Sequence, residues 1–406
     1  MKLTLITVLL GALSVCAVSS FAQIYNFTTL AGKQGIKGSS DGSGSTARFN
    51  DLYAVVPDDQ GNVYVADTYN YTIRKVTSKG VVTTIAGRPG VAGFTDGVGT
   101  GARFYFPAGM AIDATGAIYM TDASTIRKVT PDGVVTTFAG MLGVAAYQDG
   151  TGTNAGFSGL QGLAIDSAGN LYTADAGNRR TRKITTNAIV STIGGPNDFI
   201  DPRGVAVDNA GNIYVADGAG CRIQKVTQDG VVSTFAGQTW AFGSRDGLGS
   251  AARFADPQGL AIDGAGNLYV AEGGVSLIRK ITPVGMVTTI GGIGTGFADG
   301  VGSAALFHGP LGVAADKWGN IFIADTYNQL VRKGTPILPL QIYSAGSRLA
   351  VSWPSWAANY LLENRASIGD TNAWNAITNG ITGDTNNFTY TFTPTNSAQF
   401  FRVRSP

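Results

Sequence analysis

The chain has 406 residues, of which 29 are Lys or Arg and 27 are Asp or Glu, so its formal net charge at neutral pH is +2. This near balance argues against bulk electrostatic attraction to nucleic acid or to an anionic membrane surface. Hydrophobic residues make up 44% of the chain, which is enough for a large packed core. We therefore expect a globular protein with no nucleic-acid partner.

Residues 1–22 have the parts of a secretory signal peptide. Lys2 supplies a positive charge, Leu3 to Val18 is an apolar stretch, and small residues precede a cleavage point after Ala22. We predict export to the periplasm, the cell surface or the medium; a retained anchor and lipid attachment at Cys16 are the alternatives. No later apolar run approaches the roughly 18 residues of a membrane-spanning helix, so we expect no transmembrane segment.

A repeated unit organises most of the chain. Its first full copy, Gly61 to Gly87, contains three short β-rich runs separated by turns, and a fourth apolar run, Tyr53 to Val56, precedes it. Later copies follow at spacings of 42 to 55 residues and begin at Gly116, Gly169, Gly211, Gly266 and Gly319. Repeats of this length with four strands each are typical of a β-propeller.

The last copy predicts how the ring closes. It stops at Pro336 without a final strand, while Tyr25 to Gly32 near the N-terminus resembles the missing one. We therefore predict an all-β protein in which residues 23–335 form a six-bladed β-propeller closed by an N-terminal strand, which leaves no exposed edge between the first and last blades.

The repeat also resembles a known family. The pattern DGxGxxARFxxPxGxAxDxxGNxYVADxxNxxIRK is similar to NHL-repeat β-propellers of the secreted bacterial and teneurin-like form, over about residues 24–336. The resemblance implies the propeller fold. It leaves the function open, because such propellers include binding scaffolds and a few lyases.

Two sets of charged residues recur in the repeat, and we interpret both as structural. An acidic residue ends the second strand, an arginine lies on the third strand, and we expect the two to pair across the hairpin. The acids are Asp67, Asp122, Asp175, Asp217, Glu272 and Asp325, and the arginines are Arg74, Arg127, Arg182, Arg222, Arg279 and Arg332. The connections between units carry a DGxG turn, which we expect to aim the following Phe into the gap between blades; a calcium loop is the alternative.

The candidate ligand site lies where the repeat symmetry breaks. The connection between the third and fourth units is shortened to Gly195 to Arg203, so one wall of the face that carries the connections is low. Aromatic and arginine residues on the neighbouring connections are suited to a protein or glycan ligand. They are Tyr147, Arg179, Arg180, Trp240, Phe242 and Arg245. Solvated loops with a few packed aromatics are the alternative interpretation.

Enzymatic signatures are sparse. The chain has a single histidine, His308, so a zinc site of three histidines is excluded, and no GxSxG elbow, P-loop or HExxH motif is present. We favour a monomeric, non-catalytic binding scaffold without a cofactor. The alternative is a propeller lyase or lactonase with a carboxylate-bound metal such as calcium and His308 as base.

The last part of the chain has a different character. Residues 336–339 form a proline-bounded linker, and 340–406 contain short alternating runs together with Trp353 and Trp374. We predict a small fibronectin type III-like β-sandwich in which both tryptophans pack in the core.

Overall fold

The structure is a computed structural model that describes residues 6–8, 23–195, 197–337, 340–345, 348–354, 361–365, 374–383, 387–393 and 399–404. It divides into two compact units, Tyr25–Thr335 and Met1–Ile24 with Pro336–Pro406. Both units are built from antiparallel strands, as the alternating sequence predicts, and the helices among the described residues are three-residue 3-10 turns. None of the described helices has the length and hydrophobicity needed to cross a membrane.

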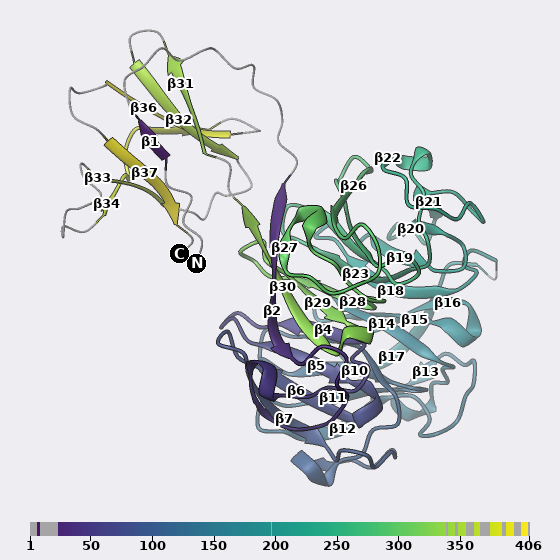
Figure 1. Cartoon of the computed structure of the whole chain (residues 1–406). Coiled ribbons are helices and arrows are strands. Elements are labelled where there is room, and N and C mark those ends of the chain that lie inside the picture. The colour runs from purple at the N-terminus through teal and green to yellow at the C-terminus, as the bar shows by residue number, and fades with distance from the viewer. Residues whose placement is uncertain are drawn as a thin grey trace. The chain divides into compact units, whose positions relative to one another are not determined.

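Each repeat forms one antiparallel sheet (Figure 1). In the first sheet, four strands follow one another as a meander, and a short fifth strand from the preceding connection pairs with the last of them. These strands are β4 (Ala54–Pro57), β5 (Val63–Asp67), β6 (Thr72–Val76), β7 (Val81–Gly87) and the added β3 (Gly42–Ser43).

Five further sheets follow the same plan. The second contains β8 (Gly97–Val98), β9 (Pro107–Ile112), β10 (Ile118–Asp122), β11 (Thr125–Val129) and β12 (Val134–Ala139). The third contains β13 (Gly150–Thr151), β14 (Leu160–Ile165), β15 (Leu171–Asp175), β16 (Arg180–Ile184) and β17 (Ile189–Ile193). The fourth has only β18 (Pro202–Val207), β19 (Ile213–Asp217), β20 (Arg222–Val226) and β21 (Val232–Gly237). The fifth contains β22 (Gly247–Leu248), β23 (Pro257–Ile262), β24 (Leu268–Glu272), β25 (Leu277–Ile281) and β26 (Met286–Gly291).

The sixth sheet joins segments from both ends of the repeat region. Strand β2 (Ile24–Gly32) lies between β27 (Gly300–Val301) and β30 (Leu330–Ile337), followed by β29 (Ile321–Asp325) and β28 (Gly312–Ala315) (Figure 1). Tyr25 and Phe27 of β2 are fully buried in a cluster with Phe307 and Ile323. The N-terminal strand is therefore part of the sixth sheet.

The 3-10 turns fall at two equivalent places in the repeats. One set follows the short added strands and comprises η1 (Gly44–Thr46), η3 (Gly99–Gly101), η4 (Gly152–Asn154), η6 (Gly249–Ala251) and η7 (Gly302–Ala304). The other set joins the second and third strands of a meander and comprises η2 (Thr68–Asn70), η5 (Ala176–Asn178) and η8 (Thr326–Asn328).

The first strands of the six meanders, here called the inner strands, contact one another in a cycle. Contacts run from β4 to β9, β14, β18, β23 and β28, and from β28 back to β4. The approach is close enough to require glycine at Gly109, because a Cβ there would lie 2.2 Å from the carbonyl oxygen of Gln161. The inner strands thus share one centre, and their glycines determine how near they come.

Buried phenylalanines fill the spaces between neighbouring sheets. Phe104 is fully buried with Ala66 and Ile73 of the first sheet and with Met110 and Met120 of the second. The equivalent residues Phe49, Phe157, Phe254 and Phe307 are also fully buried. This confirms that each DGxG turn directs the next Phe into the core.

The second unit contains two four-stranded sheets. One pairs β1 (Ile6–Val8), β37 (Gln399–Arg404), β33 (Leu361–Arg365) and β34 (Asn375–Ala376), and the other pairs β31 (Gln341–Ala345), β32 (Arg348–Pro354), β36 (Asn387–Phe392) and β35 (Ile381–Gly383). Trp353 is buried with Val351, Leu362 and Phe401, as predicted. The other tryptophan, Trp374, is half-buried and contacts the guanidinium of Arg402 instead.

Two predictions about the chain ends fall largely outside the described residues. Of the predicted signal peptide, only residues 6–8 are described, and they pair with β37. Cleavage after Ala22 would remove this strand, so the pairing belongs to the unprocessed chain. Residues 338–339 of the predicted linker are also outside the described part.

Candidate functional site

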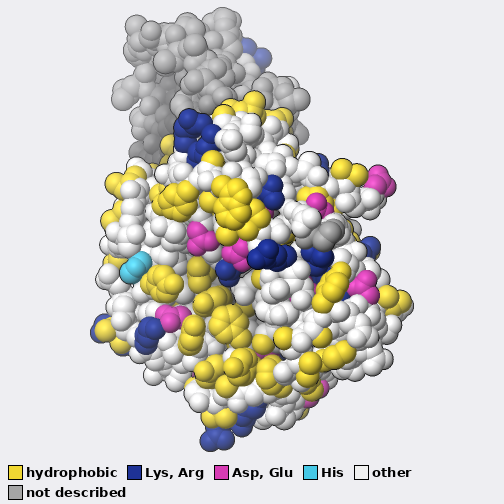
Figure 2. All heavy atoms as spheres, turned by 90° about the vertical axis from the view of Figure 1, so that its right-hand side faces the viewer, with side chains coloured by type: hydrophobic (Ala, Val, Ile, Leu, Met, Phe, Trp, Pro, Cys, Tyr) yellow, Lys and Arg dark blue, Asp and Glu magenta, His cyan; other side chains and the backbone are white. Residues whose placement is uncertain are grey.

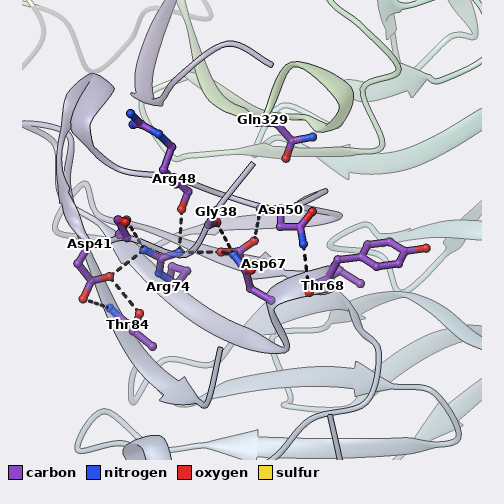
Figure 3. Close-up of polar contacts among 12 residues, drawn as sticks. Gly38, Asp41, Arg48, Asn50, Asp67, Thr68, Arg74, Thr84 and Gln329 are labelled. Atoms are coloured by element: carbon purple, nitrogen blue, oxygen red, sulfur yellow. Dashed lines mark hydrogen bonds and ion pairs between the residues drawn. The ribbon is translucent and has the colours of Figure 1, made fainter. Parts of the chain in front are cut away.

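Five of the six recurring arginines each bind two carboxylates. Arg74 is fully buried; its Nη1 donates to Oδ2 of Asp67 at 2.6 Å and its Nη2 to Oδ1 of Asp41 at 2.8 Å (Figure 3). Asp41 also accepts from the backbone N–H and the hydroxyl of Thr84. One arginine therefore connects the hairpin to the DGxG connection that covers it.

The same arrangement recurs in four other sheets. Arg127 binds Asp122 and Asp96, Arg182 binds Asp175 and Asp149, Arg279 binds Glu272 and Asp246, and Arg332 binds Asp325 and Asp299. The predicted acid–arginine pairs are confirmed in these sheets, and the DGxG aspartates are held by arginine and threonine side chains.

The fourth sheet also forms its predicted pair, Asp217 with Arg222, but from a different strand position. Gln224, not Arg222, lies at the strand position that the other arginines occupy, opposite Val215. Arg222 stands two residues earlier and donates through Nε to Asp217 at 2.9 Å and through Nη2 to the carbonyl of Asp198. The prediction aligned the residues by type, whereas the register of the hairpin assigns the position to glutamine.

The buried acids are unsuited to direct contact with a ligand. Asp67 and Glu272 are both fully buried. Burial raises the pKa of Asp67 to about 6 and that of Glu272 to about 7, although the neighbouring arginine opposes the shift in each case. Shifted pKa values often mark active sites, but here they arise from enclosure within a structural ion-pair network.

A hollow lies where the inner strands meet. Its volume is about 540 Å³, part of it open to solvent. Each inner strand contributes three consecutive residues, with a glycine or alanine in the middle. The first residue of each set, at the N-terminal end of its strand, forms what we call the rim: Tyr53, Ala108, Gln161, Arg203, Gln258 and Leu311.

One half of the rim is polar. Gln161, Arg203 and Gln258 occupy equivalent positions on β14, β18 and β23, which are successive neighbours. Nε of Arg203 donates to Asp201 at 2.8 Å, and Nε2 of Gln258 donates to Asp256 at 2.6 Å. The side chain of Arg203 is 34% exposed.

The other half of the rim is formed by Tyr53, Ala108 and Leu311, and Tyr53 has aromatic neighbours outside the rim. The ring of Tyr53 meets that of Phe106 edge-on at 5.2 Å between centroids, and the ring of Tyr69 packs against both. Burial, followed by the nearby hydroxyls of Tyr69 and Tyr327, raises the pKa of Tyr53 to about 12, so this phenol stays neutral and can donate a hydrogen bond. Figure 2 shows a face on which charged side chains of both signs gather beside a broad hydrophobic area.

The predicted ligand residues form two groups on different connections. In the first, the exposed ring of Tyr147 lies under the guanidinium of Arg180, 5.6 Å from its centroid, and Nη1 of Arg180 donates to the carbonyl of Arg179. Arg179 adopts a left-handed backbone with φ of 53° at the end of η5. The structure therefore brings Tyr147, Arg179 and Arg180 together.

The second group lies on the connection after β21. Trp240 and Phe242 are exposed, at 68% and 67%, and the backbone N–H of Trp240 donates to the carbonyl of Gly220. Arg245 donates to the carbonyl of Ala251 and so stabilises its own loop. Of this group, the two aromatic rings remain accessible to a ligand.

His308, the base of the lyase or lactonase alternative, is not among the residues that line the hollow. Its ring packs edge-on against Tyr327 at 5.3 Å, and its backbone N–H donates to Asp325. Within the described part of the chain, no three His, Cys, Asp or Glu side chains are grouped as metal ligands.

Sequence reasoning missed the polar half of the rim. The sequence predicts a fourth apolar run in each unit, and this prediction overlooks the polar residues near the start of three of these strands. They are Gln161, Arg203 and Gln258. A signal was available, because in three successive units the residue before the glycine that begins this run is polar.

Two segments match protein-family models. Residues 91–154 match the teneurin NHL domain, and residues 199–226 match the NHL repeat. Among curated proteins, Protein SUPPRESSOR OF QUENCHING 1, chloroplastic, from Arabidopsis thaliana is 36% identical over 93 residues. That match covers 22% of this chain and only 9% of the plant protein.

Several solved structures resemble the chain. A structural genomics protein of unknown function from Bacteroides thetaiotaomicron has a TM-score of 0.62 and 20% identity, over 78% of this chain and 77% of that one. An auxiliary nutrient binding protein from Bacteroides ovatus has a TM-score of 0.60 and 17% identity, over 77% of each chain. A virginiamycin B lyase from Staphylococcus aureus has a TM-score of 0.51 and 14% identity, over 77% of this chain and all of that one.

At such identities, the likeness to these structures shows a propeller-like all-β fold and no activity. The two family-model matches support an NHL-repeat family for the repeated part of this chain.

Proposed function

We propose that this chain is an exported, non-catalytic binding protein that holds a glycan at the rim of the central hollow. The observation that carries the proposal is the two-sided rim, with Gln161, Arg203 and Gln258 on one half and Tyr53 with its aromatic neighbours on the other. Aromatic rings offer flat surfaces to the C–H faces of a sugar, while amide and guanidinium groups bind its hydroxyls. One structural neighbour is an auxiliary nutrient binding protein, which agrees with a binding role.

The proposal includes a closed ring. The cyclic contacts of the inner strands and the position of β2 in the sixth sheet support six blades closed by the N-terminal strand. Closure fixes the rim residues on rigid strands, which favours binding because little side-chain ordering is then required. The remaining parts of the proposal are a cleaved signal peptide over 1–22, a monomeric state, and a fibronectin type III-like unit over 340–406 as a spacer or second adhesive module.

The predicted outer residues extend this proposed surface. Tyr147, Arg179 and Arg180 on one side, and Trp240, Phe242 and Arg245 on another, are candidates to contact a longer glycan or a protein partner. Their exposure supports this role, because exposed aromatic residues and arginines are frequent at binding surfaces.

A thermal-shift screen of residues 23–406 against soluble polysaccharides tests the proposal, since a ligand that binds the native state raises the melting temperature. We expect one glycan to raise it, and calorimetry with that glycan to show about tenfold weaker binding for Arg203→Ala and for Gln161→Ala. Gln60→Ala, in an exposed turn away from the rim, is the matched control and should bind normally.

The outcomes separate the competing interpretations. If Arg179→Ala, Arg180→Ala and Trp240→Ala together weaken binding while the rim variants do not, the outer residues form the site. If no glycan raises the melting temperature, the glycan proposal is contradicted and a protein ligand remains. A shift with calcium or zinc that EDTA reverses favours the lyase or lactonase alternative.

A further inference from the structure

Five of the six sheets have their outermost meander strand covered by the chain itself. In the first sheet, β3 pairs with β7, Gly44 N–H donates to the carbonyl of Gly80, and Asp41 accepts from the backbone N–H of Thr84. The same three contacts recur in the second, third and fifth sheets. In the sixth sheet, β27 pairs with β2 and Asp299 accepts from Thr29.

The fourth sheet lacks this cover. Its strand order ends at β21, with no fifth strand beyond it. Thr234, which corresponds to Thr84, is exposed, whereas the equivalent threonines of the other five sheets are half-buried. Val232 is partly exposed, whereas the equivalent Val82, Val135, Val190 and Val287 are buried.

The short connection before the fourth sheet explains the difference. Phe199 is 2% exposed and fills the core position of the other connection phenylalanines. Asp198 supplies a carbonyl to Arg222 and Gln224. This connection therefore keeps the buried phenylalanine of its counterparts but does not form their added strand. The outward N–H and C=O groups of β21 consequently have no strand partner among the described residues.

Nothing in the sequence of β21 protects this edge. Val232 to Gly237 contains neither a charged residue nor proline, the two commonest means of blocking strand addition, and Val231 just before it is 61% exposed. An open edge of this composition accepts an extended strand through main-chain hydrogen bonds.

We propose that β21 is a docking edge for an extended segment of a partner protein with an Asp-Gly step, added antiparallel as β3 is added to β7. The partner's carboxylate accepts from the N–H and hydroxyl of Thr234, as Asp41 accepts from Thr84. Gln224 replaces the arginine that holds the carboxylate in the covered sheets, so the docked segment lacks the ion pair. That difference makes the contact reversible, while the other five are permanent parts of the fold.

A fluorescent peptide with the sequence of residues 94–104, FTDGVGTGARF, is a suitable probe because it contains the segment that covers the second sheet. We expect saturable anisotropy on titration with the intact chain. Thr234→Pro removes the outward N–H and hydroxyl without breaking the bonds to β20, and should abolish saturation. The peptide with Asp96→Ala should bind about tenfold more weakly.

A double-mutant cycle protects this test from misfolding of the proline variant. Thr234→Val retains the N–H and removes only the hydroxyl. The loss of affinity caused by Thr234→Val should be smaller for the Asp96→Ala peptide than for the original peptide, because both changes remove the same contact. Equal binding by the chain and by Thr234→Pro, or no binding at millimolar peptide, overturns the proposal. Concentration-dependent dimers that Thr234→Pro dissolves would also overturn it, in favour of a second copy as the occupant.

Discussion

Arg74 and Asp67 are both fully enclosed, and Nη1 of the arginine donates to Oδ2 of the aspartate across 2.6 Å. The second carboxylate of this arginine, Asp41, is 48% exposed and belongs to the connection that covers the sheet. One guanidinium thus joins strand, hairpin and connection. Charge-assisted hydrogen bonds of this kind are shorter and stronger than neutral ones, so they help to determine how the connection lies.

Arg74→Met should lower the free energy of unfolding by about 3–5 kcal/mol, because it leaves the enclosed Asp67 without its charge partner. Chemical denaturation of the intact chain measures this loss in the free energy of unfolding. Arg88→Ala, at an exposed position, is the control and should change it by less than about 0.5 kcal/mol. Similar values for the two variants would show that the buried pair has no special role in stability.

The buried acids predict the direction of a pH dependence. Because the pKa is about 6 for Asp67 and about 7 for Glu272, against roughly 4 for the unfolded residues, the folded chain binds these protons more tightly. This tighter proton binding contributes its full stabilisation below about pH 4, and the contribution is lost as the pH rises through about 6 to 7. The melting temperature should therefore fall between about pH 5.5 and pH 8, and less so in Asp67→Asn with Glu272→Gln. A rise over this range would contradict the assignment.

Gly204→Ala tests the close approach of the inner strands. A Cβ at Gly204 would lie 2.4 Å from the carbonyl oxygen of Gln258, a backbone atom that cannot move without displacing β23. We expect a loss of several degrees in melting temperature and altered ligand binding at the rim. Gly264→Ala is the matched control, since its Cβ meets nothing within 4 Å, and it should leave stability unchanged or raise it slightly. Equal melting of both variants would contradict the packing of the inner strands.

Deleting residues 24–31 tests the role of the N-terminal strand. The deletion removes Tyr25 and Phe27 from the core and exposes the outer edge of β30, so we expect aggregation or a large loss of stability. Light scattering and thermal melting measure the two effects. Phe27→Ala is a milder version, with an expected cost of about 3–5 kcal/mol. Unchanged melting of the deletion would refute ring closure by this strand.

Much of the fold can be predicted from the sequence because it depends on interactions between residues that are close in the chain. The alternation in Val63 to Asp67 predicts a strand, and the repeated spacing from Asp67 to Arg74 predicts a hairpin pair, since both residues belong to one hairpin. The burial of Phe104 follows from its place after a tight turn. Each of these inferences concerns residues within one repeat, where turn type and strand period determine which side chains meet.

The tertiary structure decided what lies between repeats. Gln161, Arg203 and Gln258 are about 40 to 55 positions apart in sequence and meet only because three inner strands converge on one centre. The register of β20 puts Gln224, and not Arg222, at the strand position that buried arginines occupy in the other sheets. The open edge of β21 likewise emerges only by comparison with five covered edges. Residue types along a chain predict which strands form, but the distances between strands depend on packing, and these distances determine both the rim and the docking edge.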